Sequence, residues 1–270
     1  MRKFAAIVFA LVLMLAFAGC GNTPAGTTPD EKKTVVVGAS PLLKDMLTVA
    51  KEEFDKDGYT MDLKIFDDLV TPNIALQEGS VDVNFFQHEP YLLQFNKNKG
   101  TNLVKYQNGI VKYYMALFSK KFKNVNDLPE GASVSIPNDP SNRSRALKVL
   151  QTHGLIKLKE GAELPTKLDI VENNKNLNII ETDVMKLVTS LDDVDLSVIN
   201  SLVAVQGNLD PKSALAVEDK GESDKFSLVI AVKKDQGNEK YAERLEKALK
   251  SEKVKQFLET KYKGAVLPLF

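Results

Sequence analysis

The feature that most constrains the fold is a repeated alternation of short apolar runs with helical patterns. Residues 35–39 are predicted to form a buried strand, and Pro41 then opens a helix whose apolar residues recur at helical spacing. The same order follows along the chain, with predicted strands at 61–66 and 81–86 and predicted helices over 71–79 and 90–100. A β-α-β-α-β series of this kind predicts a parallel sheet covered by helices.

After a predicted strand over 111–119 the series begins again. It predicts a helix that ends near His153, a short helix near 185–190 and strands at 133–136, 177–181 and 196–200. Two segments show the repetition, because 81–87 (VDVNFFQ) and 194–200 (VDLSVIN) both enter a strand from Val-Asp and leave it at an amide. A further strand over 226–232 precedes a terminal helix predicted over 238–261. Two similar α/β units fit this order better than one large domain.

The first twenty residues predict export. Arg2 and Lys3 precede an uninterrupted apolar run over 4–18, which Gly19 and the only cysteine, Cys20, follow. A spanning helix needs about 20 apolar residues, whereas a basic start, a shorter apolar run and small residues describe a secretion signal. Residues 15–20 (LAFAGC) resemble a bacterial lipobox, which implies that Cys20 receives a diacylglyceryl group and starts the mature chain. The alternative is an ordinary signal with an incidental cysteine.

Composition bounds what the mature chain can be. Residues 22–33 are rich in Thr, Pro and Gly and have no apolar period, so we expect a flexible tether between the lipid and the folded part. With Cys20 lipidated no intrachain disulfide is possible, and the core must hold the fold. Removal of Arg2 and Lys3 lowers the basic count from 36 to 34, against 36 acidic residues. This balance gives no reason to expect a nucleic-acid partner.

Polar residues stand at the carboxyl ends of the predicted strands. In open α/β sheets, ligands bind beyond these ends. Each unit alone supplies half a pocket, so we expect a cleft between two lobes that closes on one small molecule. The residues at the strand ends are Ser40, Asp67, Gln87 with His88, Asn138 with Asp139, and Asn200.

Two segments, 86–92 (FQHEPYL) and 137–145 (PNDPSNRSR), resemble the signature segments of the methionine-binding lipoproteins of bacterial ABC importers. The similarity extends from about residue 35 to 264, with supporting matches at Phe66, Asp68, Pro72, Asn73, 168–177 and 198–200. It implies an α/β fold of the two-lobed periplasmic-binding-protein type (type II), with a ligand cleft between the lobes and two hinge crossovers. The implied parts of the chain are a lipoprotein signal peptide over 1–19, the lipidated cysteine and tether over 20–33, a first lobe over 34–108 plus 226–270, and a second lobe over 109–225.

The resemblance implies a lipid-anchored protein on the extracytoplasmic face of the cell membrane. Such a protein captures an amino acid, methionine or a related apolar one, and delivers it to the permease and ATPase of an ABC importer. A short-peptide-binding importer component and a surface adhesion or sensor lipoprotein without a transport role are the alternatives. Leu69, Val203 and Ser227 stand where the family usually has other residue types, so the ligand stays open among these classes.

The resemblance also implies the ligand contacts. Arg145 aligns with the family's carboxylate-binding arginine, and a planar guanidinium suits a bidentate carboxylate; Arg143 is the competing candidate. Aromatic side chains after the strand ending at Phe86 would form a polarizable wall for a thioether. Asn200 can offer a carbonyl to the ligand ammonium and an amide to its carboxylate. The expected contacts are Phe66, Phe86, His88, Tyr91, Asn142, Arg145, Asn200 and Ser227.

Catalysis and cofactor chemistry are not expected. The chain has two histidines, and it lacks a His-Glu-x-x-His motif, a Gly-x-Ser-x-Gly elbow and a phosphate-binding glycine loop. We therefore interpret His88 as a hydrogen-bonding residue of the cleft rather than a metal ligand. The expectation is a protein with no metal, no cofactor and no enzymatic activity; a hydrolase is the weaker alternative.

Overall fold

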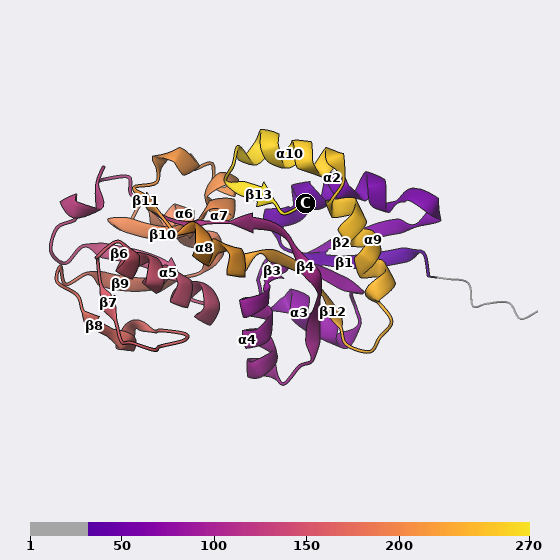
Figure 1. Ribbon diagram of the computed structural model, residues 1–270, viewed down its shortest axis with the longest axis horizontal. Helices are drawn as coiled ribbons and strands as arrows, with labels where there is room; N and C mark the ends of the chain where they lie inside the picture. Colours follow the sequence, from indigo (N-terminus) through magenta and orange to yellow (C-terminus); the bar gives the residue numbers. More distant parts are fainter. Residues whose placement is uncertain (1–31) are drawn as a thin grey trace, which may run out of the picture. The chain divides into compact units, whose positions relative to one another are not determined.

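Two β-sheets organise the described part of the chain, residues 32–270, in this computed structural model (Figure 1). The first sheet has the strand order β13-β4-β12-β3-β1-β2 and the second has the order β11-β5-β10-β6-β9. We call the parts built on these sheets the first and the second lobe. The arrangement confirms the predicted α/β fold with two lobes. Cys20 and the predicted signal peptide lie outside the described residues.

The first lobe combines three parallel strands with three antiparallel ones. β1 pairs with β2 and β3 in parallel, whereas the pairs β3–β12, β12–β4 and β4–β13 are antiparallel. Its strands are β1 (Thr34–Ala39), β2 (Thr60–Ile65), β3 (Val83–His88), β4 (Leu103–Tyr113), β12 (Leu228–Lys233) and β13 (Val266–Pro268). Its helices are η1 (Pro41–Leu43), α2 (Lys44–Phe54), η2 (Lys56–Gly58), α3 (Thr71–Glu78), α4 (Glu89–Lys99), α9 (Glu239–Leu249) and α10 (Glu252–Tyr262).

The second lobe places β10 between a parallel and an antiparallel neighbour, β6 and β5. Its strands are β5 (Met115–Phe118), β6 (Ser133–Pro137), β9 (Asn178–Thr182), β10 (Leu196–Asn200), β11 (Ala216–Val217) and the separate hairpin of β7 (Lys157–Leu158) and β8 (Ile170–Glu172). Its helices are η3 (Val125–Asp127), α5 (Pro140–Thr152), η4 (Lys167–Asp169), η5 (Val184–Lys186), α6 (Leu187–Ser190), α7 (Ser201–Gln206) and η6 (Pro211–Ser213). Two short helices, α8 (Lys220–Ser223) and η7 (Asp224–Phe226), lead back to β12.

The apolar periods of the sequence become the core. Val35, Val37 and Ala39 of β1 are fully buried, and α2 buries the face that carries Met46, Leu47, Ala50 and Phe54. α2 packs beside α9 and α10 over this sheet (Figure 1). Among residues 32–270, no helix is both long and apolar enough to cross a bilayer.

The repeated segments 81–87 and 194–200 become corresponding strands, β3 and β10. Every residue of both strands is buried, and each strand ends in a side chain that caps the next helix. His88 Nδ1 accepts a hydrogen bond from Tyr91 N at 3.1 Å, and Asn200 Oδ1 accepts one from Val203 N at 2.9 Å. The repeat therefore sets one polar side chain at the carboxyl end of a strand in each lobe.

Two elements differ from the sequence prediction. The sequence predicts one strand over 111–119, but the chain changes sheets between Tyr113 and Met115, because β4 pairs with β12 while β5 pairs with β10. The sequence also predicts one helix over 238–261, but it divides into α9 and α10 because Ser251 adopts the extended backbone of an N-cap residue.

The chain crosses between the lobes twice, after β4 and before β12. β4 continues the first sheet to Tyr113, beyond the predicted border at 108/109. A Cβ atom at Gly109 would lie 2.1 Å from Ser227 Oγ, so only glycine fits where the two crossing segments touch. The register of β12 against β4 also shifts between Leu228 and Ile230. Close packing and irregular pairing thus coincide at the crossings.

Asp195 joins β10 to β6 at the start of both strands. Its carboxylate accepts hydrogen bonds from Ser133 N at 2.9 Å, from Ser133 Oγ at 2.8 Å and from Lys121 Nζ at 2.9 Å. The hydrogen bond from Lys121 and those from Ser133 lower the pKa of Asp195 to about 2. The ionised carboxylate therefore stabilises the folded second lobe.

We predict that Asp195→Asn lowers the free energy of unfolding at pH 7 by about 1 to 2 kcal/mol, because it weakens these hydrogen bonds. Since folding lowers the pKa of Asp195, its contribution is present above about pH 4 and is lost as pH falls toward 2. Urea unfolding at pH 7 and pH 2.5 measures both effects. Asp192→Asn is the matched control, because Asp192 is exposed and pairs with Lys120 on the surface. Equal losses in the two variants would contradict the role of Asp195.

Candidate functional site

A cavity of about 30 Å³ lies where β3 and β10 end, and residues of both lobes line it. Bulk water occupies about 30 Å³ per molecule, so this interlobe cavity has room for about one water. The lining residues are Leu42, Leu69, Phe86, Gln87, His88, Tyr91, Tyr113, Asn142, Val184, Asn200, Leu202 and Leu228. Mixed apolar and amide lining of this kind is typical of small-molecule sites.

The structure brings together most of the predicted contacts. Those that line the interlobe cavity are Phe86, His88, Tyr91, Asn142 and Asn200. The other three lie elsewhere: Arg145 is behind the lining, Phe66 packs on the cluster of Ala75 and Leu76, and Ser227 packs on Gly109. The roles of all eight residues in ligand binding stay predictions.

Aromatic rings form one side of the interlobe cavity. The ring of Tyr91 stands edge-on to that of Phe86, at 6.1 Å, and to that of His88, at 6.3 Å. Tyr91 Oη donates a hydrogen bond to Leu69 O at 2.7 Å, which fixes the ring. Burial raises the pKa of Tyr91 well above its usual value, so the phenol remains a donor.

His88 connects the two lobes. Its Nδ1 accepts from Tyr91 N, so Nε2 carries the proton and donates to Asn142 Oδ1 in the second lobe at 3.2 Å. Burial, followed by the positive charge of Arg145, lowers the pKa of His88 to about 4. At neutral pH the imidazole is therefore an uncharged hydrogen-bond donor to the other lobe.

Asn142 is held by the residue that caps its own helix. Asp139 Oδ1 accepts a hydrogen bond from Asn142 N at 3.0 Å, and Asn142 Nδ2 donates to both carboxylate oxygens at 3.1 and 2.9 Å. Its Nδ2 is thus turned toward Asp139, and its Oδ1 accepts from His88. The start of α5 therefore orients the second-lobe partner of His88.

Arg145 is only 1% exposed and lies against Tyr113 and Phe226. Its Nε and Nη2 donate to the two carboxylate oxygens of Glu218 at 2.7 and 2.6 Å, and Nη2 also donates to Tyr113 O at 2.8 Å. Nη1 is buried without a hydrogen-bond partner among the described residues. Glu218 therefore occupies two of the three guanidinium nitrogens in this structure, and the contact of Arg145 with a ligand carboxylate stays a prediction.

The competing arginine, Arg143, lies away from the interlobe cavity. Its Nη1 donates to Glu181 Oε2 on β9 at 3.2 Å. Arg143 and Arg145 are two positions apart on α5, so their side chains leave the helix on different faces. The structure thus separates two candidates that the sequence leaves together.

The helix cap fixes the orientation of the Asn200 side-chain amide. Its Oδ1 accepts from Val203 N, while Nδ2 has no hydrogen bond to any described residue and lies at the interlobe cavity. Asn200 is therefore ready to donate to a ligand carboxylate. The expected carbonyl contact with an ammonium group competes with the helix cap.

Several features of the site have no signal in the sequence. The sequence places Gln87 at a strand end, but it does not reveal the two hydrogen bonds, at 2.8 and 2.7 Å, that Gln87 exchanges with Asn73 and that fix its amide. Glu218 is distant from Arg145 in the sequence, so no local pattern links them. Leucine and valine residues of the lining cannot be told from core residues by periodicity.

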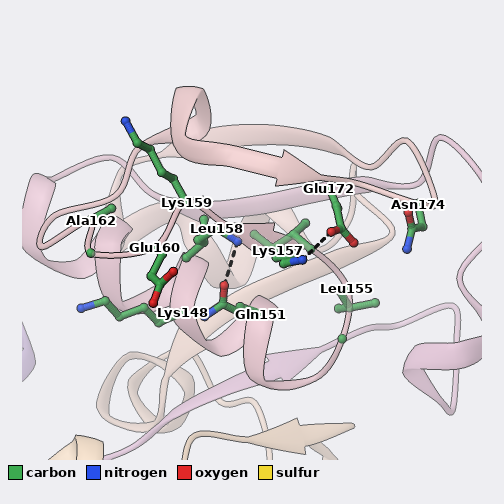
Figure 2. A pocket seen from close by; sticks show the side chains of 13 residues that line it. Lys148, Gln151, Leu155, Lys157, Leu158, Lys159, Glu160, Ala162, Glu172 and Asn174 are labelled. Carbon is green, nitrogen blue, oxygen red and sulfur yellow. Dashed lines mark hydrogen bonds and ion pairs between the residues drawn. The ribbon is translucent and has the colours of Figure 1, made fainter.

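A larger hollow, of about 700 Å³, lies in the second lobe beside the β7–β8 hairpin (Figure 2). It contains none of the predicted contacts, and its lining comes from residues 148–174 of one lobe. Lys157 at its rim pairs with Glu172 in water-exposed positions. Within residues 32–270, no group of three His, Cys, Asp or Glu side chains is placed to hold a metal ion. We therefore take the interlobe cavity as the candidate ligand site.

We predict that the parent loses stability as pH falls from about 6.5 to 4, because unfolding lets His88 bind a proton that the folded state excludes. The shift in its pKa corresponds to about 2 to 3 kcal/mol at pH 4.5. Urea unfolding at pH 7.5 and 4.5 should show a smaller loss in His88→Gln than in the parent. His153→Gln, which changes the only other histidine, is the control. A pH dependence that His88→Gln leaves unchanged would contradict a buried neutral imidazole.

Known proteins are similar to this chain in sequence and in fold. Residues 35–270 match the family model described as NlpA lipoprotein. The D-methionine-binding lipoprotein MetQ of Yersinia pestis is 44% identical over 235 residues, which are 85% of this chain and 84% of that protein. A solved nutrient binding protein from Burkholderia cenocepacia bound to methionine is 39% identical, with a TM-score of 0.81 over 87% of this chain and 100% of its own.

A substrate binding protein of a methionine transporter from Streptococcus pneumoniae has a TM-score of 0.82 at 31% identity, over 88% of this chain and 96% of its own. These similarities extend over both lobes and confirm the resemblance that segments 86–92 and 137–145 indicate. They also confirm the two-lobed substrate-binding-protein fold. The chain therefore belongs to the NlpA lipoprotein family.

Proposed function

We propose that this protein captures methionine between its lobes and delivers it to an ABC importer. The observation that carries the proposal is the interlobe cavity, which only the two lobes together enclose. The names of the similar proteins support methionine as the ligand, because they describe D-methionine-binding and methionine-bound relatives. Capture by closure also suits a protein that must bind its cargo and later release it.

Ligand entry requires the lobes to separate. The interlobe cavity holds about 30 Å³, and an amino acid needs several times the room of one water. Separation breaks the hydrogen bond between His88 of the first lobe and Asn142 of the second. Reclosure on a ligand restores contacts from both sides, so the closed state is favoured by ligand binding.

The two ends of methionine find different surroundings. Phe86 and Tyr91 present ring edges and faces, against which a thioether packs well. In the described part of the chain, Asn200 Nδ2 and Arg145 Nη1 have no hydrogen-bond partner, so both can donate to the carboxylate. Micromolar affinity needs about 8 kcal/mol, whereas one charge-assisted hydrogen bond contributes about 1.5 to 3 kcal/mol. Contacts from both lobes must therefore combine.

A lipid anchor at Cys20 would hold the protein on the extracytoplasmic face, beside the importer's permease. Family membership supports this proposal, since the family and several relatives are described as lipoproteins. Residues 15–20 supply the matching lipobox-like sequence. Two acyl chains anchor a protein stably, whereas one chain does so only marginally.

We predict that methionine raises the thermal midpoint of ligand-stripped protein by several degrees. A ligand at 100 times its dissociation constant adds about 2.7 kcal/mol, and each kcal/mol moves the midpoint of a domain of this size by about 2 to 4 °C. A thermal-shift panel should include both enantiomers of methionine, other apolar amino acids, short peptides, lysine and glutamate. If only short peptides raise the midpoint, the ligand is a short peptide and the assignment of methionine is wrong.

We predict that Asn200→Ala weakens methionine binding at least tenfold in calorimetric titration, because it removes a donor to the carboxylate. Asn124→Ala is the matched control. Asn124 also caps a helix, with Oδ1 accepting from Asn126 N at 2.9 Å, but it does not line the interlobe cavity. Equal affinities in Asn200→Ala and the control would remove Asn200 from the site.

We predict that Cys20→Ala leaves folding intact and moves the protein from the membrane fraction to the soluble one. Lipidation requires the thiol, and the folded lobes begin after residue 32. Detergent partitioning of both forms, with thermal unfolding of each, measures the two outcomes. Membrane retention by the variant would contradict the anchor at Cys20.

A further inference from the structure

The Arg145–Glu218 ion pair lies where the chain first crosses between the lobes. Arg145 Nη2 donates to Tyr113 O at the end of β4, and Met115 N at the start of β5 donates to Glu218 Oε2 at 3.1 Å. The pair therefore holds the backbone on both sides of Tyr114. Its two side chains are 1% and 3% exposed, so water screens their charges little.

The second crossing packs against the same pair. Phe226 lies two residues before the start of β12, and its ring lies 4.2 Å from the guanidinium carbon of Arg145. The His88 ring meets Phe226 edge-on at 5.0 Å. Arg145 thus contacts both crossings and, through Phe226, the imidazole that lines the interlobe cavity.

The two charges of the pair compensate each other, and the carboxylate of Asp139 is a further negative charge nearby. Glu218 compensates Arg145, His88 is uncharged at neutral pH, and burial raises the pKa of Tyr113 to about 12. Asp139 is half-buried and gives its carboxylate to Asn142 and Ser141. One donor of the pair, Arg145 Nη1, has no hydrogen-bond partner among residues 32–270, although it is fully buried.

We propose that Glu218 is a specificity-determining residue that turns Arg145 from a free cation into one hydrogen-bond donor of a neutral pair. The proposal rests on the proposed function, since it assumes that the carboxylate of methionine binds at Arg145 Nη1. A neutral pair donates one hydrogen bond to an oxygen of the ligand carboxylate, but it exerts little net attraction on the negative charge of that carboxylate. It also repels a cationic ligand far less than a lone guanidinium does.

The test compares L-methionine with L-methioninamide, which keeps the side chain and the ammonium but replaces the carboxylate by a neutral amide. The selectivity ratio is the dissociation constant of the amide divided by that of methionine, from calorimetric titration. Glu218→Gln removes the compensating charge, so we expect the ratio to rise at least tenfold above that of the parent. Loss of affinity for both ligands by the same factor would show a merely structural role and overturn the proposal.

Glu181→Gln is the matched control. Glu181 on β9 pairs with Arg143, which lies on the same helix as Arg145, and this pair does not line the interlobe cavity. We expect its selectivity ratio to stay within about threefold of the parent's. A rise equal to that of Glu218→Gln would show a general charge effect and would overturn the local assignment.

A double variant keeps the proposal testable if Glu218→Gln does not unfold cooperatively. Arg145→Met with Glu218→Met replaces the whole pair by apolar side chains, a change that buried pairs often tolerate. If the pair is neutral, the double variant has a selectivity ratio less than tenfold below that of the parent. A larger fall means that Arg145 acts as a free cation in the parent, and it overturns the proposal. Failure of the proposed function has a different signature, since the parent itself would then not bind methionine.

Discussion

A buried arginine needs an anion and acceptors for the donors that it withdraws from water, and Arg145 finds them for Nε and Nη2 where the lobes join. Glu218, Tyr113 O and the ring of Phe226 surround its guanidinium, and they belong to the two chain crossings. The crossings are therefore tied to the start of α5. Any ligand that reaches Nη1 contacts a group connected to both hinge segments.

This connection explains why the site and the hinge coincide. The interlobe cavity uses the ends of β3 and β10, where His88 and Asn200 cap the helices that follow. Because His88 stays neutral, it can bridge to Asn142 without bringing a buried charge into the closed state. The lobes thus close on hydrogen bonds, ring edges and one neutral ion pair. A zwitterionic amino acid with an apolar side chain complements such a surface.

Local patterns predict much of this arrangement and miss what depends on distant pairing. Segments 86–92 and 137–145 each run from a strand end into a helix, so the sequence predicts Phe86, His88 and Tyr91 after one strand, and the family resemblance adds Asn142 from the other lobe. The change of sheet after Tyr113 is hidden in a continuous β-favouring run, because strand pairing rather than periodicity decides it. Glu218 lies 73 positions from Arg145 and is one of 36 acidic residues. Only the folded chain reveals that it occupies the guanidinium.

A crystal structure of the protein grown with methionine tests the central claim most directly. The account predicts density for one methionine between the lobes, with its thioether against Phe86 and Tyr91 and its carboxylate within hydrogen-bond distance of Arg145 Nη1 and Asn200 Nδ2. It also predicts that the Arg145–Glu218 pair persists beside the ligand. Methionine bound elsewhere, as in the hollow of residues 148–174, or bound between the lobes with Glu218 displaced from Arg145, would contradict the account.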